Sequence, residues 1–175
     1  KGRVPFLNFF DGFRTSHEIQ KIAVWDYDDL AEMVDMDAVN AFRQRGLNPQ
    51  HPQMRGSHEN GDIFFQNREA SNKYYDAVPD LVEEYMGKIN AKIGTNYQLF
   101  NYYGAPDADR VIISMGSICD VAEEVIDYLN AHGEKVGLVK VRLYRPFRAD
   151  KLIAAIPATC KKIAVLDRTK EPGAQ

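Results

Sequence analysis

The sequence predicts an α/β fold built on a parallel β-sheet, and three observations support this prediction. Short apolar runs with the length and composition of buried strands occur at 111–116, 136–143 and 162–167. Stretches with a helical spacing of apolar residues separate them, at 118–129 and 149–156. Glycine or proline marks the boundaries between these elements. Strands that alternate with helices in this order form a βαβαβ unit, in which right-handed crossovers keep the strands parallel.

The stretch before this unit, residues 3–44, predicts a partial α/β segment. Its apolar run at 4–10 predicts a short buried strand, which Asp11-Gly12 ends. The sequence Thr15-Ser16-His17-Glu18 then has the form of a capping box, in which a hydroxyl caps a helix and a glutamate three residues later reaches back. Apolar residues between Leu30 and Phe42 predict a further helix.

Residues 46–72 form an irregular stretch that is rich in turn-forming residues. A loop of this length inside a compact domain is typical of a functional segment or an interface. A helix is predicted to start near Pro79 and to end at Gly94. Its apolar residues share one face: Val82, Tyr85, Met86, Ile89 and Ile93. The aromatic residues between Tyr97 and Tyr103 predict a linker that packs its rings between two domains.

The composition excludes several classes of protein. A net charge of −3 and an isoelectric point near 5.8 argue against a nucleic-acid-binding protein. No apolar run approaches the length of a membrane span. The two cysteines, Cys119 and Cys160, cannot supply the four ligands of a structural zinc site or an iron–sulfur cluster. We expect two reduced thiols and a cytoplasmic protein.

Gly116-Ser117 is a turn between a predicted strand and a predicted helix, which is where open α/β sheets often bind anions. It lacks the further glycines of a phosphate-binding loop, so we favour a plain turn with Ser117 as the helix cap. Cys119, near the start of the same helix, is interpreted as a buried structural cysteine. The histidines His51 and His58 do not have metal-site spacing. The sequence therefore predicts no metal site and no catalytic residue.

Polar residues follow two other predicted strands. Arg168, Thr169, Lys170 and Glu171 come directly after the strand at 162–167, and Arg14, Thr15 and Ser16 follow the strand at 4–10. Such residues bind a phosphate or a carboxylate, contact a neighbouring domain, or form a solvated loop. Together with Gly116 and Ser117 they are our candidate binding or domain-interface residues.

A second basic group, Arg142, Arg145 and Arg148, need not converge, because Arg145 differs in strand parity from the other two. It is interpreted as surface charge.

The predicted sheet would have bare edges, and the chain starts and stops abruptly. We therefore expect a piece of a larger protein.

Four peptides carry a resemblance to a known family. In chain order they are 9–18 (FFDGFRTSHE), 48–52 (NPQHP), 102–104 (YYG) and 167–174 (DRTKEPGA). They resemble the pyruvate:ferredoxin (flavodoxin) oxidoreductase family, and the resemblance runs nearly end to end. It implies that residues 1–100 are the C-terminal part of a first, pyrimidine-binding-type domain with a linker. Residues 101–175 would be a truncated domain like the transketolase C-terminal domain.

The resemblance also implies the activity of a parent enzyme. That enzyme converts pyruvate and CoA to acetyl-CoA and CO₂ and reduces ferredoxin or flavodoxin. It uses thiamine diphosphate, Mg²⁺ and iron–sulfur clusters, and it is a homo-oligomer. This segment would hold no cofactor, would contact other domains of the enzyme, and would be a structural part that is inactive alone. Two alternatives stay open: a related 2-oxoacid oxidoreductase, and a stand-alone flavodoxin-like interaction module.

Overall fold

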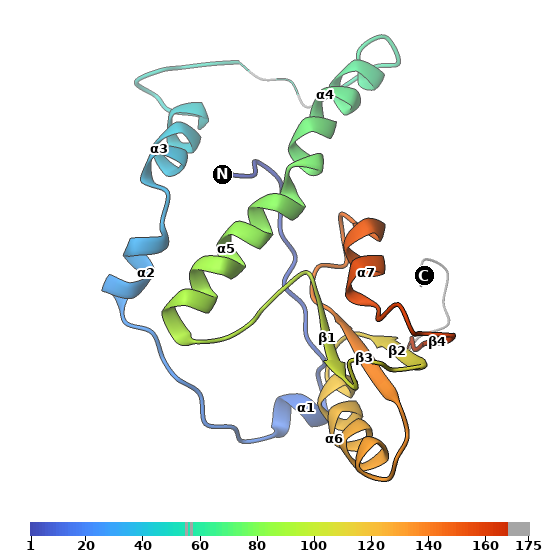
Figure 1. The fold of residues 1–175 in the computed structure, drawn as a ribbon. Helices are drawn as coiled ribbons and strands as arrows, with labels where there is room; N and C mark the ends of the chain where they lie inside the picture. The colour runs from blue at the N-terminus through green and yellow to red at the C-terminus, as the bar shows by residue number, and fades with distance from the viewer. Residues whose placement is uncertain (55, 57, 168–175) are drawn as a thin grey trace. The chain divides into compact units, whose positions relative to one another are not determined.

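The computed structural model describes residues 1–54, 56 and 58–167 (Figure 1). The chain divides into two compact units. The helical unit comprises Lys1–Phe6 and Lys21–Leu81, and the sheet unit comprises Leu7–Gln20 and Val82–Gln175. The predicted boundary near residue 100 stays a prediction.

The helical unit contains α2 (Tyr27–Met33), α3 (Met36–Arg45) and α4 (Phe64–Asp76). Aspartates begin the first two helices. The Asp26 carboxylate accepts a hydrogen bond from the Asp29 backbone N–H at 2.8 Å, and the Asp35 carboxylate accepts one from the Ala38 backbone N–H at 2.9 Å. Such caps satisfy backbone donors that a helix leaves unpaired at its start. Asp35 thus divides the single helix predicted between Leu30 and Phe42 into two.

Two predictions for the first stretch are wrong. Residues 4–10 form no strand, and Phe9 and Phe10 are 66% and 79% exposed. An apolar run becomes a buried strand only where a partner strand and a covering layer exist. The capping box is also absent. Thr15 lies inside α1 (Arg14–His17), and the Ser16 hydroxyl donates to the Phe13 carbonyl oxygen at 2.8 Å.

The predicted irregular stretch is shorter than expected, because α4 begins at Phe64. The helix after it is confirmed as α5 (Val78–Ile93), which Gly94 ends with a left-handed φ of 70°. Within the sheet unit, Val82 and Met86 of this helix pack against one of the two clusters of the core. Two of the five residues on the predicted face are therefore used for packing, whereas Ile93 is 44% exposed.

The sheet has four strands in the order β1-β3-β2-β4. The strands are β1 (Phe100–Gly104), β2 (Arg110–Ser114), β3 (Val136–Val141) and β4 (Lys162–Val165). β2 pairs in parallel with both β3 and β4, whereas β1 pairs antiparallel with β3. The α/β fold with a parallel βαβαβ unit is thus confirmed. The stretch predicted to be a linker contains β1, an additional edge strand.

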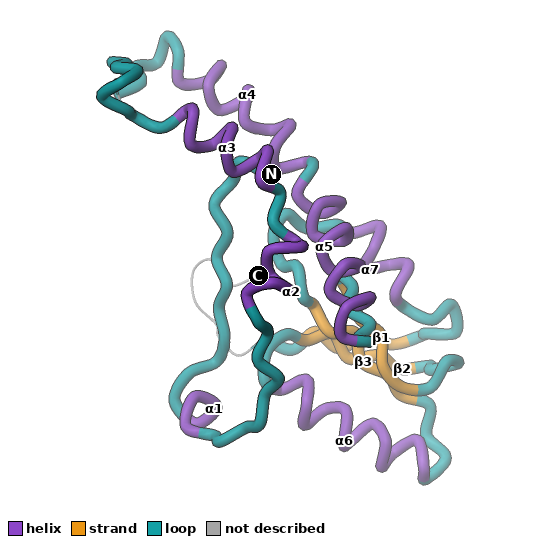
Figure 2. Tube along the Cα trace, turned by 90° about the vertical axis from the view of Figure 1, so that its left-hand side faces the viewer, coloured by secondary structure: helices purple, strands orange, loops and turns teal. Residues whose placement is uncertain are grey.

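Two helices cover opposite faces of the sheet, α6 (Ile118–Ala131) and α7 (Ala149–Ala155) (Figures 1 and 2). The connection through α6 runs from β2 to β3, and that through α7 runs from β3 back across β2 to β4. Right-handed crossovers in opposite directions place their helices on opposite faces. Leu138 and Val139, both 0% exposed, point to opposite faces, so each helix has an apolar partner.

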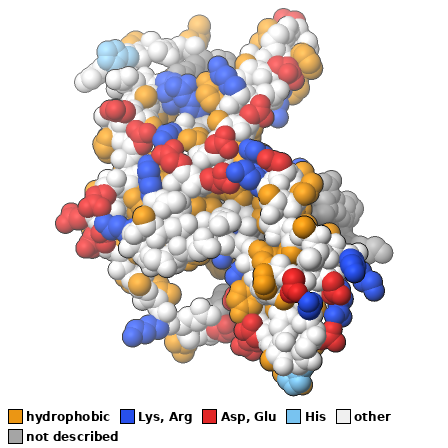
Figure 3. All heavy atoms as spheres, viewed as in Figure 1, with side chains coloured by type: hydrophobic (Ala, Val, Ile, Leu, Met, Phe, Trp, Pro, Cys, Tyr) orange, Lys and Arg blue, Asp and Glu red, His pale blue; other side chains and the backbone are white. Residues whose placement is uncertain are grey.

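The core of the sheet unit therefore has two clusters. One cluster joins Cys119 and Ile126 of α6 to Leu138 of β3. On the other face α7 packs against a cluster that contains Leu99, Phe100, Ala108, Val111, Ile113 and Val139. None of the helices in the described residues is long and apolar enough to cross a membrane. Acidic and basic side chains are interspersed on the face shown in Figure 3.

Candidate functional site

The carboxyl ends of β2 and β4 form the edge at which a ligand site is expected. The two strands are parallel neighbours, with Ile113 opposite Val165, and the Leu166 backbone N–H donates to the Ile113 carbonyl oxygen at 3.0 Å. Open α/β sheets bind ligands beyond the carboxyl ends of their strands. Gly116 and Ser117 follow β2 here. Residues 168–171 follow β4 but lie outside the described residues, so their role stays a prediction.

The turn after β2 is occupied by a carboxylate from another part of the unit. The Ser117 backbone N–H donates to Asp11 Oδ2 at 2.7 Å, across 106 positions of the sequence. Gly116 has a φ of 81°, and a Cβ atom there would lie 2.8 Å from the same oxygen. A carboxylate at a helix start is stabilised by the unpaired N–H groups and by the helix dipole. Asp11 therefore takes the place that an anionic ligand would occupy at α6.

The contact between Asp11 and Ser117 differs from the predicted cap of α6. Ser117 stands at the N-cap position of α6, but its side chain makes no capping hydrogen bond. Asp11 supplies the acceptor instead. Arg14 and Ser16 are exposed and Thr15 is half-buried, and no hydrogen bond among the described residues joins them to Gly116 or Ser117. Asp11 brings their segment to the turn after β2, and their binding or interface role stays a prediction.

Removing this cap gives a direct test of its contribution. We expect Asp11→Ala to lower the free energy of unfolding by about 1 kcal/mol, because the backbone donor at the start of α6 loses its partner. Asp11→Asn keeps an oxygen acceptor but not the charge, so it should lose only about 0.3–1 kcal/mol. Urea denaturation followed by circular dichroism measures both changes.

The control for this test is Glu124→Ala, because Glu124 is an exposed residue of the same helix. It should change the stability by less than about 0.5 kcal/mol. Equal stability of Asp11→Ala and the wild-type chain would contradict the assigned cap.

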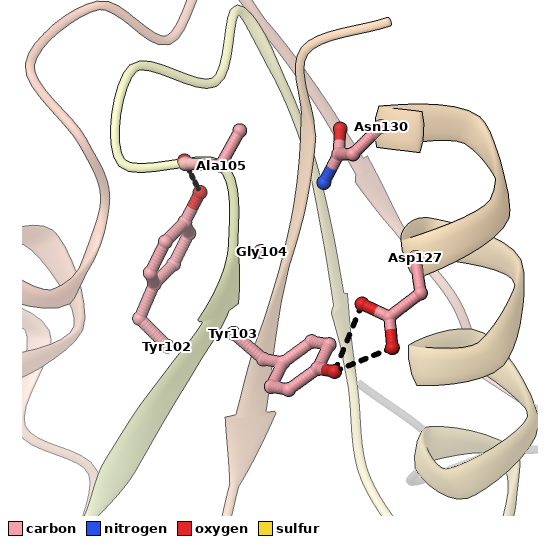
Figure 4. Close-up of a pocket in the computed structure, with 6 residues that line it drawn as sticks. All are labelled: Tyr102, Tyr103, Gly104, Ala105, Asp127 and Asn130. Atoms are coloured by element: carbon pink, nitrogen blue, oxygen red, sulfur yellow. Dashed lines mark hydrogen bonds between the residues drawn. The ribbon is translucent and has the colours of Figure 1, made fainter. Parts of the chain in front are cut away.

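A pocket lies beside β1 and has a volume of about 490 Å³ (Figure 4). Its polar groups are already paired. The Tyr103 hydroxyl donates to both oxygens of Asp127 at 2.8 and 2.9 Å, and this hydrogen bond raises the pKa of Tyr103. The Asn130 side chain bonds both the N–H and the carbonyl of Val136. The Tyr102 hydroxyl donates to the Ala105 carbonyl oxygen. The Tyr103 bond joins β1 to α6 and the Asn130 bonds join α6 to β3, so these groups already have structural roles and we assign no ligand to the pocket.

The two cysteines are free thiols in different environments. Cys119 lies on the buried side of α6 and is 5% exposed, and burial raises the pKa of its thiol despite the opposing charge of Lys140. This agrees with a structural cysteine, and the helix start does not activate it. Cys160 is half-buried and packs against the cluster on the opposite face of the sheet.

We expect a thiol reagent at pH 8 to modify Cys160 at least about tenfold faster than Cys119, because alkylation needs an accessible thiolate. Mass spectrometry of the two cysteine peptides against time measures both rates. In urea the two rates should converge. Faster modification of Cys119 than of Cys160 in the folded chain would contradict the burial of the Cys119 thiol.

Comparisons with known proteins cover almost the whole chain. One family model, "Pyruvate flavodoxin/ferredoxin oxidoreductase, thiamine diP-bdg", matches residues 1–87, and another, "Pyruvate:ferredoxin oxidoreductase core domain II", matches residues 108–175. The pyruvate-flavodoxin oxidoreductase of Enterobacter agglomerans is 63% identical over 99% of the chain. The pyruvate:ferredoxin oxidoreductase of Moorella thermoacetica is 60% identical over 99% of the chain. The chain spans 15% of the length of each of these relatives.

Among solved structures, the chain is similar to 2-oxoglutarate:ferredoxin oxidoreductase from Magnetococcus marinus, which has 2-oxoglutarate, coenzyme A and succinyl-CoA bound. The match has a TM-score of 0.44 and a sequence identity of 23%. It covers 66% of this chain and 18% of the other.

Proposed function

The chain belongs to the pyruvate:ferredoxin (flavodoxin) oxidoreductase family, and on this premise we propose that it is a segment of an enzyme that oxidises pyruvate. The enzyme converts pyruvate and CoA to acetyl-CoA and CO₂ and passes the electrons to ferredoxin or flavodoxin. One observation carries this proposal: the identity of 60–63% to relatives named pyruvate-flavodoxin oxidoreductase and pyruvate:ferredoxin oxidoreductase extends over 99% of the chain. The activity belongs to the larger protein, because the chain spans 15% of those relatives.

Within that enzyme, we propose that this segment has a structural role. The matched family description includes thiamine diphosphate binding, but the described residues do not fit the cofactor. A diphosphate at the start of α6 would meet the Asp11 carboxylate, which has the same sign of charge. The described residues contain no group of three or more His, Cys, Asp or Glu side chains that could hold Mg²⁺.

An iron–sulfur cluster does not fit either. Cys119 and Cys160 pack into the two clusters on opposite faces of the sheet, so they cannot share one metal site. We propose that other parts of the enzyme hold thiamine diphosphate, Mg²⁺ and the iron–sulfur clusters. The sheet unit would then support the neighbouring domains, and no residue described here takes part in a chemical step.

The finer expectations for the enzyme follow from the family. We propose that it is a homo-oligomer and that its partners are ferredoxin or flavodoxin. The two free thiols are compatible with a reducing compartment, so we propose the cytoplasm. We also propose that Arg14, Thr15, Ser16 and residues 168–171 contact a neighbouring domain, pyruvate or CoA.

The enzyme activity is tested with the full-length protein in which this segment occurs. We expect reduction of ferredoxin or flavodoxin that requires both pyruvate and CoA. A stronger response to another 2-oxoacid would identify the related oxidoreductase instead, and no response to any 2-oxoacid would favour an interaction module.

The structural role has separate tests. Titration of this 175-residue chain with thiamine diphosphate should show no tight binding, and tight binding would contradict the role. For the binding or interface residues, Arg168→Ala and Lys170→Ala should alter the pyruvate or CoA kinetics or the stability of the full enzyme. If all of these are unchanged, the proposal for residues 168–171 is wrong.

A further inference from the structure

Arg142 directly follows β3, at the same edge of the sheet as Gly116. Its backbone N–H donates to the Leu99 carbonyl oxygen at 2.9 Å, which fixes where the side chain starts. Its positive charge acts on Cys119 in the first turn of α6, where it lowers the thiol pKa against the dominant effect of burial. Arg142 thus starts at the edge at which parallel sheets bind ligands.

Two groups hold the guanidinium in one position. Arg142 Nε donates to Asn101 Oδ1 at 2.7 Å. The guanidinium carbon lies 4.6 Å from the centre of the Tyr97 ring, within the range of a cation–π contact. A hydrogen bond at Nε and a ring beneath the plane fix both the direction and the tilt of the group.

The residues that hold Arg142 are themselves fixed. Asn101 is 9% exposed, its Oδ1 also accepts from the Gln98 backbone N–H at 3.0 Å, and its Nδ2 donates to the Asn96 carbonyl oxygen at 2.6 Å. The Asn90 side chain bonds the backbone N–H of Tyr97 at 2.7 Å and its carbonyl oxygen at 2.9 Å. Little conformational freedom remains to be lost when a ligand binds, which favours binding.

The terminal nitrogens of Arg142 differ from those of six other basic side chains in the sheet unit. Those six have acidic partners: Lys88, Arg110, Lys135, Lys140, Arg148 and Lys151. For Arg142, none of the residues that the structure describes supplies an acidic partner or an acceptor to either Nη. An ordered guanidinium with both Nη atoms available matches the two oxygens of a carboxylate or a phosphate.

We propose that Arg142 binds an oxyanion of a soluble ligand, a carboxylate or a phosphate, with Tyr97 and Asn101 as positioning residues. The start of α6 does not compete for this anion, because Asp11 already occupies it. This site does not depend on the proposed reaction. Pyruvate and CoA, the proposed substrates, both carry groups of this class.

The test is protection of Arg142 from phenylglyoxal, an arginine reagent, in the full-length protein. Inorganic phosphate and acetate are the probes, each at constant ionic strength adjusted with chloride. Mass spectrometry of the peptide that contains Arg142 measures the rate of modification. A probe at ten times its Kd should slow the reaction about tenfold, because only about a tenth of the sites stay free. Protection by phosphate alone or by acetate alone identifies the oxyanion.

Arg110 is the internal control, because its guanidinium is bonded to Asp109 and Glu134 within the chain. Its rate should not depend on the probe. Two results would overturn the proposal. One is an Arg142 rate that neither probe changes. The other is an Arg142 that is unreactive without any probe, since this would mean that a carboxylate elsewhere in the protein fills the site.

A variant tests whether Tyr97 positions the guanidinium. Tyr97→Leu keeps Arg142 and should weaken protection by the effective probe about tenfold, because the cation–π contact and the fixed tilt are lost. Tyr128→Leu, at an exposed tyrosine of α6, is the matched control and should leave protection unchanged. Equal protection in Tyr97→Leu and the wild-type protein would refute the positioning role. The measurement on the wild-type protein decides the site even if this variant does not fold.

Discussion

Replacing Gly104 with alanine is expected to destabilise the sheet unit by about 3 kcal/mol or more. Gly104 is the last residue of β1 and has a φ of 119°, which side chains with a Cβ rarely adopt. A Cβ atom there would lie 2.6 Å from the Val136 carbonyl oxygen and 2.8 Å from Gly137 Cα. Both atoms belong to the backbone of the paired strand β3, so neither can move aside without loss of strand pairing.

The free energy of unfolding from urea denaturation measures this effect. Gly87→Ala is the matched control, because Gly87 lies in α5 and a Cβ there meets nothing within 4 Å. It should stabilise the chain by about 0.5–1 kcal/mol, since alanine favours a helix over glycine. A Gly104→Ala chain as stable as the wild type would mean that β1 and β3 do not approach each other this closely.

Replacing Asn101 with alanine is expected to lower the free energy of unfolding by about 3 kcal/mol. The side chain is buried, and it is the partner of the Gln98 N–H, the Asn96 carbonyl and Arg142 Nε. In the alanine variant these three groups lose their hydrogen bonds to the Asn101 side chain. Unpaired buried polar groups lower the free energy of unfolding. Because the same side chain orients Arg142, the variant should also weaken protection of Arg142 by oxyanions.

Asn72→Ala is the matched control, because the Asn72 side chain is exposed and bonds to Glu69 on the same helix. Its stability should stay within about 0.5 kcal/mol of the wild type. Differential scanning calorimetry compares the two variants. If both lose the same amount, Asn101 is not the centre of a buried network.

The family, the parallel unit and its two helices follow from local features of the sequence. Apolar runs of strand length at β2, β3 and β4, and a helical stripe at α6, are properties of neighbouring residues, so they can be read without a structure. The same reasoning failed for residues 4–10. Apolar composition shows that a segment is able to be buried, but the presence of a partner strand decides whether it is.

The strand β1 could not be predicted for a related reason. Its sequence, Phe100–Gly104, mixes aromatic and polar residues without a clear alternation. Its pairing with β3 is a contact between distant parts of the chain, with Phe100 opposite Val141. Nothing within the strand itself specifies such a partner, so the aromatic residues resembled a linker.

For the candidate site, the sequence by itself determined that a glycine-containing turn follows β2 and that basic and polar residues follow the strands. Only the tertiary structure decided what those groups meet. Asp11 reaches the start of α6 across 106 positions, and Arg142 meets Asn101 across 41 positions. The physical reason is that turns and periodic faces depend on local backbone preferences, whereas the partner of a charge depends on how distant segments pack.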